Sequence, residues 1–212
     1  MKQNENIFKS KGLLIKIIET SLRFWIRRSC TSVSELKFSI NETTQSLLKG
    51  NISNIKTFAK KVVFQGLIID EIELVASNIK IDFKSLPTKL SFKEEFKVNF
   101  NIKTSDISLT KTLLSKKWKW LGELLCRELL GTDSLTKLTI SESYLELNGI
   151  VKSLKSTEKS TFRLIADTGK IVLFNKINSN KFTIPMENSV FIDKAFLDNN
   201  SILISGKAKI KS

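Results

Sequence analysis

The side chains that most often carry out acid–base or nucleophilic chemistry are absent from this sequence or poorly placed in it. The chain has no histidine, which excludes Ser-His-Asp and Cys-His catalysis and His-ligated zinc. It also has no GxSxG elbow and no glycine-rich phosphate loop. Carboxylates gather at Asp70, Glu71 and Glu73 and at Glu94 and Glu95, but neighbours on a strand point to opposite faces. We therefore expect a protein that is not an enzyme, with no cofactor and no metal site.

Aromatic and basic residues that alternate along the chain form a second candidate for function. Trp118, Lys119 and Trp120 follow directly on Lys116 and Lys117. Tryptophan rings favour the headgroup region of a bilayer, and lysines reach lipid phosphates. The same pattern also suits a nucleic-acid surface, or two rings packed on a sheet with solvated lysines. The residues that we expect at headgroups or at a membrane surface are Arg23, Arg27, Arg28, Lys116, Lys117 and Lys119.

Large apolar side chains are abundant enough to line a binding groove as well as a core. The chain contains 14 phenylalanines and is 41% apolar. Two interpretations remain open: a closed, well-filled core, or a core left partly open as a groove for acyl chains. The residues that we expect to contact lipid in such a groove are Phe64, Phe83, Phe92, Phe96, Phe100, Trp25, Trp118 and Trp120.

Two segments have the periodicity of long amphipathic helices. In residues 13–28, the apolar side chains spread over about 220° of the helix circumference at 100° per residue. A surface helix needs an apolar stripe only somewhat wider than about 100°. Residues 107–130 show a similarly wide apolar arc, with Ser105 and Asp106 as candidate N-caps and Gly131 as the stop. Both helices are therefore predicted to be covered on most sides.

The segments between and after these helices alternate with the two-residue period of half-buried strands. The clearest is residues 90–103, in which Phe92, Phe96 and Phe100 share one face. In residues 67–83 the apolar set moves from even to odd positions, which predicts a β-bulge or a sharp bend near residues 76–78. Turn residues occur at 65–66, 167–169 and 197–200.

This order of elements predicts an α+β fold. We expect an elongated, strongly twisted antiparallel β-sheet wrapped around two long amphipathic helices. Residues 1–10 are predicted to be a disordered polar tail. Residues 11–212 would form a single lipid-binding domain, with helix-meander halves at about 11–104 and 105–212.

The net charge of the chain indicates which kinds of partner it could bind. The net charge of +14 attracts any polyanion, whether nucleic acid or anionic bilayer. Only five of the basic residues are arginines, whereas proteins that recognise phosphates and base edges favour arginine, so nucleic acid is the less favoured partner.

Cys30 and Cys126 fit no metal or redox motif, and we expect free thiols in a reducing compartment. The sequence shows no signal peptide and no transmembrane segment, which predicts a cytoplasmic protein that could attach peripherally to a membrane.

Three stretches in the first part of the chain resemble a known family. LRFWIR at residues 22–27, ISNI at residues 52–55 and VVFQGLIIDEIELVASNIKIDF at residues 62–83 resemble the LmeA-like phospholipid-binding family, long classed as a domain of unknown function. The similarity covers about residues 13–130 and is greatest to the cyanobacterial branch. It implies a fold like that of tubular lipid-binding (TULIP) domains and a role in membrane lipid homeostasis. The family offers no established catalytic residues, and its actinobacterial members carry an export signal that this chain lacks.

Together these features predict a non-enzymatic lipid-binding protein that binds or transfers phospholipid in membrane lipid homeostasis. Its expected partners are a phospholipid or another diacyl lipid and an anionic membrane surface. A basic nucleic-acid-binding protein and a structural domain with a closed core are the alternatives. The sequence leaves the lipid species and the oligomeric state open.

Overall fold

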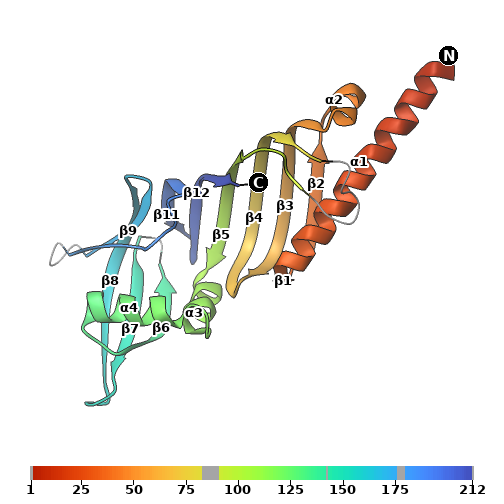
Figure 1. Cartoon of the computed structure of the whole chain (residues 1–212). Coiled ribbons are helices and arrows are strands. Elements are labelled where there is room, and N and C mark those ends of the chain that lie inside the picture. The colour runs from red at the N-terminus through yellow and green to blue at the C-terminus, as the bar shows by residue number, and fades with distance from the viewer. Residues whose placement is uncertain (1, 83–90, 142, 176–179, 212) are drawn as a thin grey trace.

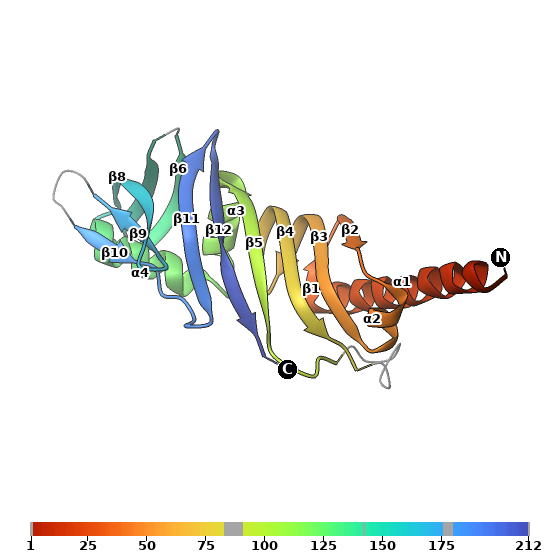
Figure 2. The ribbon, with the colours of Figure 1, turned by 90° about the horizontal axis from the view of Figure 1, so that it is seen from above.

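Strands account for more of the chain than helices do, and they form two antiparallel sheets (Figure 1). The computed structural model describes residues 2–82, 91–141, 143–175 and 180–211. The predicted α+β fold, a single sheet wrapped around two long helices, is wrong. The chain is mostly β, and its helices pack on the sheets without being enclosed by them. Figure 2 shows the strands of the larger sheet side by side, with α1 running past the β2 end.

The larger sheet has seven strands among the described residues, in the order β1-β3-β4-β5-β12-β11, with β2 also paired to β3. Strands β11 and β12 come from the C-terminal part of the chain, yet β12 pairs along its whole length with β5. The two ends of the sequence are therefore joined in one sheet. Its strands are β1 (Cys30–Ser32), β2 (Glu35–Ile40), β3 (Asn51–Phe64), β4 (Leu67–Lys80), β5 (Phe96–Ser105), β11 (Val190–Asp198) and β12 (Ser201–Ile210).

The smaller sheet has five strands in the described part of the chain, in the order β10-β9-β8-β7-β6. Each strand pairs with its neighbour in sequence, as in a meander. Its strands are β6 (Ser134–Ile140), β7 (Leu145–Val151), β8 (Ser156–Asp167), β9 (Lys170–Phe174) and β10 (Lys181–Thr183).

The first predicted helix forms, but the second is broken into two. The helices are α1 (Lys2–Ser29), α2 (Thr44–Leu48), α3 (Asp106–Leu114) and α4 (Lys119–Leu130). Helix α3 starts at the predicted cap, where the Ser108 N–H donates to Ser105 Oγ. It ends at Leu114, and the extended backbone of the C-cap residue Ser115 (ψ 150°) turns the chain before α4 begins. Gly131 ends α4 in the left-handed conformation (φ 66°), as predicted.

Helix α1 begins at Lys2 and so includes residues that the sequence places in a polar tail. It packs on the large sheet through one side only. Ile18 and Leu22 are buried against Ile52, Ile55 and Ile79, while Leu13 and Phe24 stay 61% and 57% exposed on the opposite side. The wide apolar arc of this helix is therefore not clasped by the protein.

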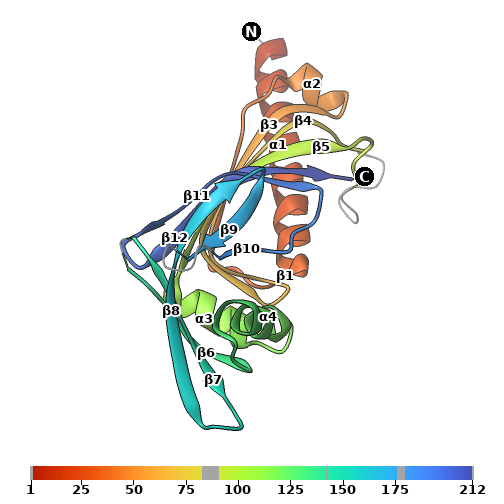
Figure 3. The same cartoon turned by 90° about the vertical axis from the view of Figure 1, so that its left-hand side faces the viewer.

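Helix α4 packs on the small sheet, α3 lies against both β6 and β4, and the two helices close a second core that also includes Ile202 of β12. Leu113, Leu121 and Leu125 contact strand residues such as Leu147 and Phe162. Figure 3 shows α1 and these two helices on the same side of the large sheet. Within the described residues, no helix is long and apolar enough to cross a membrane.

Candidate functional site

The large sheet has one continuous apolar face, which we call the inner face because it contacts the helices. The strand register aligns its side chains in rows that cross the sheet. Ile72 pairs with Ile102, which pairs with Ile204, and Leu74 pairs with Phe100 in the next row. Directly opposed side chains on one face pack against each other. The first row continues to Ala59 of β3 and is a continuous apolar band, whereas Leu74 and Phe100 form a shorter band between Thr57 and Gly206.

The middle of the inner face is left partly uncovered. Leu74, Phe100 and Ala208, which we call the central strip, are each half-buried. Among the described residues they belong to none of the buried clusters, which lie under α1 on one side and around α3 and α4 on the other. The central strip is therefore an apolar surface between two cores and fully covered by neither.

Three of the predicted groove aromatics meet at the α1 side of the central strip. The rings of Phe92 and Phe96 lie 4.7 Å apart between centroids, and Trp25 of α1 meets Phe92 edge-on at 6.4 Å. Because Phe96 and Phe100 are four residues apart on β5, they share the inner face, as the alternation predicts. Phe83 lies outside the described residues.

The other three predicted aromatics lie elsewhere, at the turn between β3 and β4. Gln65 and Gly66 both have positive φ (50° and 83°), as a two-residue hairpin turn requires, and Phe64 pairs with Leu67 across it. The Trp118 indole Nε1–H donates to the Gln65 carbonyl at 3.0 Å. Trp120 stacks on Trp118 with centroids 6.4 Å apart. These side chains therefore do not line the central strip.

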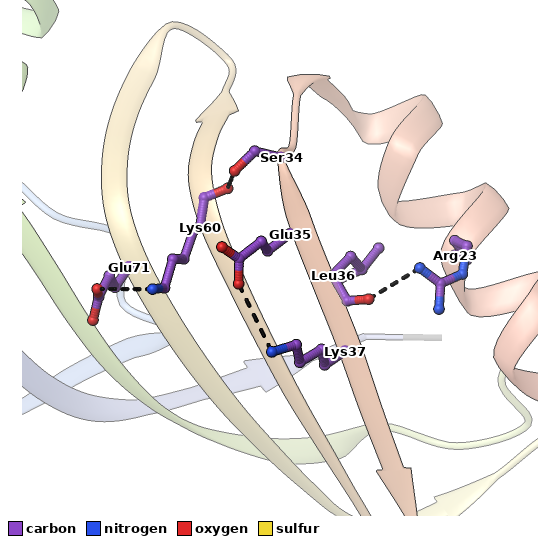
Figure 4. Close-up of polar contacts among 7 residues, drawn as sticks. All are labelled: Arg23, Ser34, Glu35, Leu36, Lys37, Lys60 and Glu71. Carbon is purple, nitrogen blue, oxygen red and sulfur yellow. Dashed lines mark hydrogen bonds and ion pairs between the residues drawn. The ribbon is translucent and has the colours of Figure 1, made fainter.

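The predicted headgroup cations also separate into two kinds. Arg23 is engaged within the fold, because its Nη1 donates to the Leu36 carbonyl of β2 at 3.0 Å (Figure 4). Its guanidinium also lies 5.4 Å from the Phe38 ring centroid. Arg27 and Arg28 are exposed in the last turn of α1. Lys116 and Lys117 are exposed at the α3–α4 junction, and Lys119 pairs with Glu123 at 3.5 Å.

The acidic cluster on β4 is divided between the two faces of the sheet. Asp70 accepts hydrogen bonds from the Ser105 N–H and the Ser108 hydroxyl, at 2.5 and 2.7 Å, and so holds α3 against β4. Burial raises the pKa of Asp70, but the hydrogen bonds from Ser105 and Ser108 outweigh it and leave the pKa below its ordinary value. Glu71 faces outward and pairs with Lys60 at 3.7 Å (Figure 4).

The outer face of the large sheet, opposite the helices, has two hollows that the sequence analysis did not predict. Phe58 and Phe196 line a hollow of about 320 Å³ together with Glu71, Glu73 and Lys103. A neighbouring hollow of about 230 Å³ shares Phe58 and adds Lys37 and Lys56. In the sequence, Phe58 alternates in step with Lys56 and Lys60. This shared period could have predicted that the Phe58 ring lies on the lysine-bearing face of the strand.

Comparison with known protein families, with curated proteins and with solved structures gave no match. The resemblance to the LmeA-like family therefore stays a prediction from the sequence.

Proposed function

We propose that the protein is a non-enzymatic lipid-binding protein that holds acyl chains of a phospholipid, or of another diacyl lipid, on the central strip. The observation that carries the proposal is the half-burial of Leu74 and Phe100 on an inner face whose two flanks are closed by buried clusters. The side chains of Leu74, Phe100 and Ala208 cannot form hydrogen bonds with water. An apolar ligand would remove that unfavourable contact.

Lipid binding on the central strip would not require a specific polar site. Transfer of one methylene from water to an apolar surface contributes about 0.8 kcal/mol, so a lipid with two chains gains enough from partial coverage to stay bound. The Trp25, Phe92 and Phe96 cluster would extend the same surface towards α1. Chain length would then influence affinity more than headgroup identity does.

The biological setting that we propose is lipid binding or transfer at a membrane surface, in membrane lipid homeostasis. The resemblance to the LmeA-like family supports this setting. A peripheral position on the cytoplasmic side agrees with the two thiols, because Cys30 and Cys126 are free and free thiols are typical of reducing compartments.

The direct test is native mass spectrometry of the freshly purified full chain, followed by solvent extraction and lipid analysis. We expect a bound species whose mass equals that of a phospholipid or another diacyl lipid, and we expect extraction to release it. A protein that emerges lipid-free and that also fails to take up lipid from vesicles would contradict the proposal.

A second candidate function, binding of single-stranded nucleic acid, is favoured by the outer face alone. Phe191 and Phe196 are 50% and 48% exposed there, and Lys207 lies over the Phe191 ring with its Nζ 5.6 Å from the centroid. Exposed rings among lysines can stack bases and neutralise phosphates. Glu71 and Glu73 in the adjacent hollow oppose this. An RNA mobility shift that weakens steeply with salt and is lost in Phe196→Ala would favour this function over lipid binding.

A further inference from the structure

The fold brings together two basic segments that are about ninety residues apart in the sequence. The end of α1 leads directly into β1, where Cys30 pairs with Phe64 at the end of β3. On the other side of the same turn, Lys117 Nζ donates to Gln65 Oε1 at 2.9 Å and Trp118 donates to the Gln65 carbonyl. The β3–β4 turn therefore lies between the end of α1 and the α3–α4 junction.

The result is one surface at one end of the large sheet, which we call the basic tip. Figure 1 shows the C-terminal end of α1, the β3–β4 turn and α3 at the same edge of the sheet. The basic tip consists of Arg27, Arg28, Phe64, Leu114, Lys116, Lys117 and Trp120.

Large apolar side chains are exposed on the basic tip. Phe64 is 42% exposed, Leu114 46% and Trp120 50%. The support beneath Trp120 is fixed, because Trp118 is hydrogen-bonded to the turn and lies against Gly66, where a Cβ would be 3.4 Å from the Trp118 Cδ1. Trp120, stacked on Trp118, is thereby held at the surface. Exposed apolar side chains that gather in one place are typical of an interaction site.

The charge around these side chains is positive and not compensated within the protein. Among the described residues, Arg27, Arg28, Lys116 and Lys117 form no ion pair. The neighbouring carboxylate of Glu123 is paired with Lys119, and that of Glu35 is paired with Lys37. An anion that approached the basic tip would therefore meet several available cations.

We propose that the basic tip docks the protein on an anionic phospholipid bilayer. Phe64, Leu114 and Trp120 enter the interfacial region, where tryptophan is favoured and apolar side chains leave water. Arg27, Arg28, Lys116 and Lys117 lie at the level of the lipid phosphates, and each adds attraction to a negatively charged leaflet. Leucine offers no base-stacking surface, so the mixture of Leu114 with two aromatics fits a bilayer better than a nucleic acid. The proposal rests on the lipid-binding function for its purpose, because docking would bring the central strip to its source of lipid.

The test is vesicle flotation of the full chain with neutral vesicles of phosphatidylcholine and with vesicles that also contain phosphatidylglycerol. We expect binding to the anionic vesicles, weakened by salt. The charge variant Arg27→Gln, Arg28→Gln, Lys116→Gln should bind at least about tenfold more weakly, since each basic residue near the surface contributes a several-fold factor in affinity. The apolar variant Phe64→Ser, Trp120→Ser should lose a similar factor.

A matched control removes the same charge from the outer face. Lys56→Gln, Lys97→Gln, Lys194→Gln removes three exposed lysines that form no ion pair among the described residues. This variant should bind anionic vesicles within about twofold of the wild type, because charges farther from the membrane than a Debye length of about 10 Å contribute little to binding. All these side chains are at the surface, and circular dichroism melting would show that each variant is folded. Equal losses in the tip variant and in this control would overturn the proposal, because net charge alone would then explain binding.

Two further outcomes separate docking from the lipid-binding function. If the tip variants still carry lipid in native mass spectrometry but no longer float with vesicles, the docking proposal stands and is distinct from acyl binding. If the wild type binds neutral and anionic vesicles equally, or binds RNA in place of vesicles and loses it in the tip variants, the docking proposal fails while the central strip can still bind lipid.

Discussion

The ring of Phe100 lies directly over Gly206 of the neighbouring strand. A Cβ added to Gly206 would be 2.7 Å from the Phe100 Cζ and would also collide with the Phe191 carbonyl oxygen. The absence of a side chain at residue 206 therefore leaves room for the Phe100 ring against β12. This contact shapes the central strip, because any larger residue there must move Phe100 or the backbone of β11.

Gly206→Ala should destabilise the protein. The new methyl group meets backbone as well as a ring, so we expect a loss of about 1–3 kcal/mol, as for other overpacked sites, measured as a lower urea midpoint. Gly12→Ala is the matched control, because a Cβ there has no atom within 4 Å and alanine is favoured over glycine in a helix by up to about 1 kcal/mol. Equal effects of the two substitutions would show that the Phe100 contact does not constrain residue 206.

Glu42 gives the stability a defined pH dependence. Its carboxylate accepts the Ser53 N–H at 2.6 Å and the Thr43 N–H at 3.0 Å, and the bonds to Ser53 lower its pKa from 4.5 to about 2. Because the folded pKa is below the unfolded one, the contribution is present above pH 4.5 and is lost as the pH falls towards 2. Glu42→Gln should therefore lower the urea midpoint at pH 7 and lower it less at pH 3.

The control for Glu42 is Glu158→Gln, which removes an exposed carboxylate from β8. We expect little change in its urea midpoint at either pH. A Glu42→Gln variant whose deficit is the same at pH 7 and pH 3 would contradict the assignment of this pH dependence to Glu42.

Asp70→Asn should loosen α3 from the large sheet. The amide can replace only part of the acceptor capacity of a carboxylate bound to Ser105 and Ser108, and we expect a loss of about 1–3 kcal/mol. Hydrogen exchange should show faster exchange in α3 than in α1. Because the folded pKa of Asp70 is lowered, the wild type should also lose this contribution as the pH falls through the titration of Asp70. Unchanged exchange in α3 would rule out this role, and Glu73→Gln on the outer face is the control.

The local features of the fold were predictable from the sequence because short-range chemistry decides them. Ser105 caps α3 and Gly131 ends α4, and the Gln65-Gly66 turn forms where it was expected. The change of face near residues 76–78 occurs at Asn78, which has φ 54°. The prediction was a bulge or a sharp bend. No bulge forms there, since β3 and β4 keep a continuous register on both sides of Asn78, and the left-handed backbone of Asn78 makes the change of face without an extra residue.

The architecture was not predictable in the same way. Alternation identifies which residues of a strand share a face, but it does not identify the partner strand, and nothing in the sequence indicates that β12 pairs with β5. The broken helix has a similar cause. The wide apolar arc of residues 107–130 was predicted to belong to one enclosed helix. Instead, a turn at Ser115 changes the direction of the chain, so that α3 and α4 both face one core.

The candidate site was predictable only where the strand period controls it. Phe96 and Phe100 lie on the inner face because alternation places them there, but Phe64 and Trp118 are at a turn, where no periodicity applies. Arg23 bonds to β2 because the Leu36 carbonyl lies on the side of β2 away from β3, a fact that requires the strand order. No site was assigned from the sequence to the outer-face rings of Phe58 and Phe196, because only the strand order places the two rings beside one hollow.

The central claim is that acyl chains bind on the central strip, and the most direct measurement is equilibrium binding of a fluorescent acyl-chain lipid to the wild type and two carboxylate variants. Phe100→Asp places a charge on the strip, and Asn99→Asp places the same charge on the adjacent outer-face residue of β5. We expect Phe100→Asp to bind at least about tenfold more weakly, because a buried carboxylate opposes apolar contact, and Asn99→Asp to bind like the wild type. Equal affinity in all three folded proteins, or no binding by the wild type, would contradict the claim.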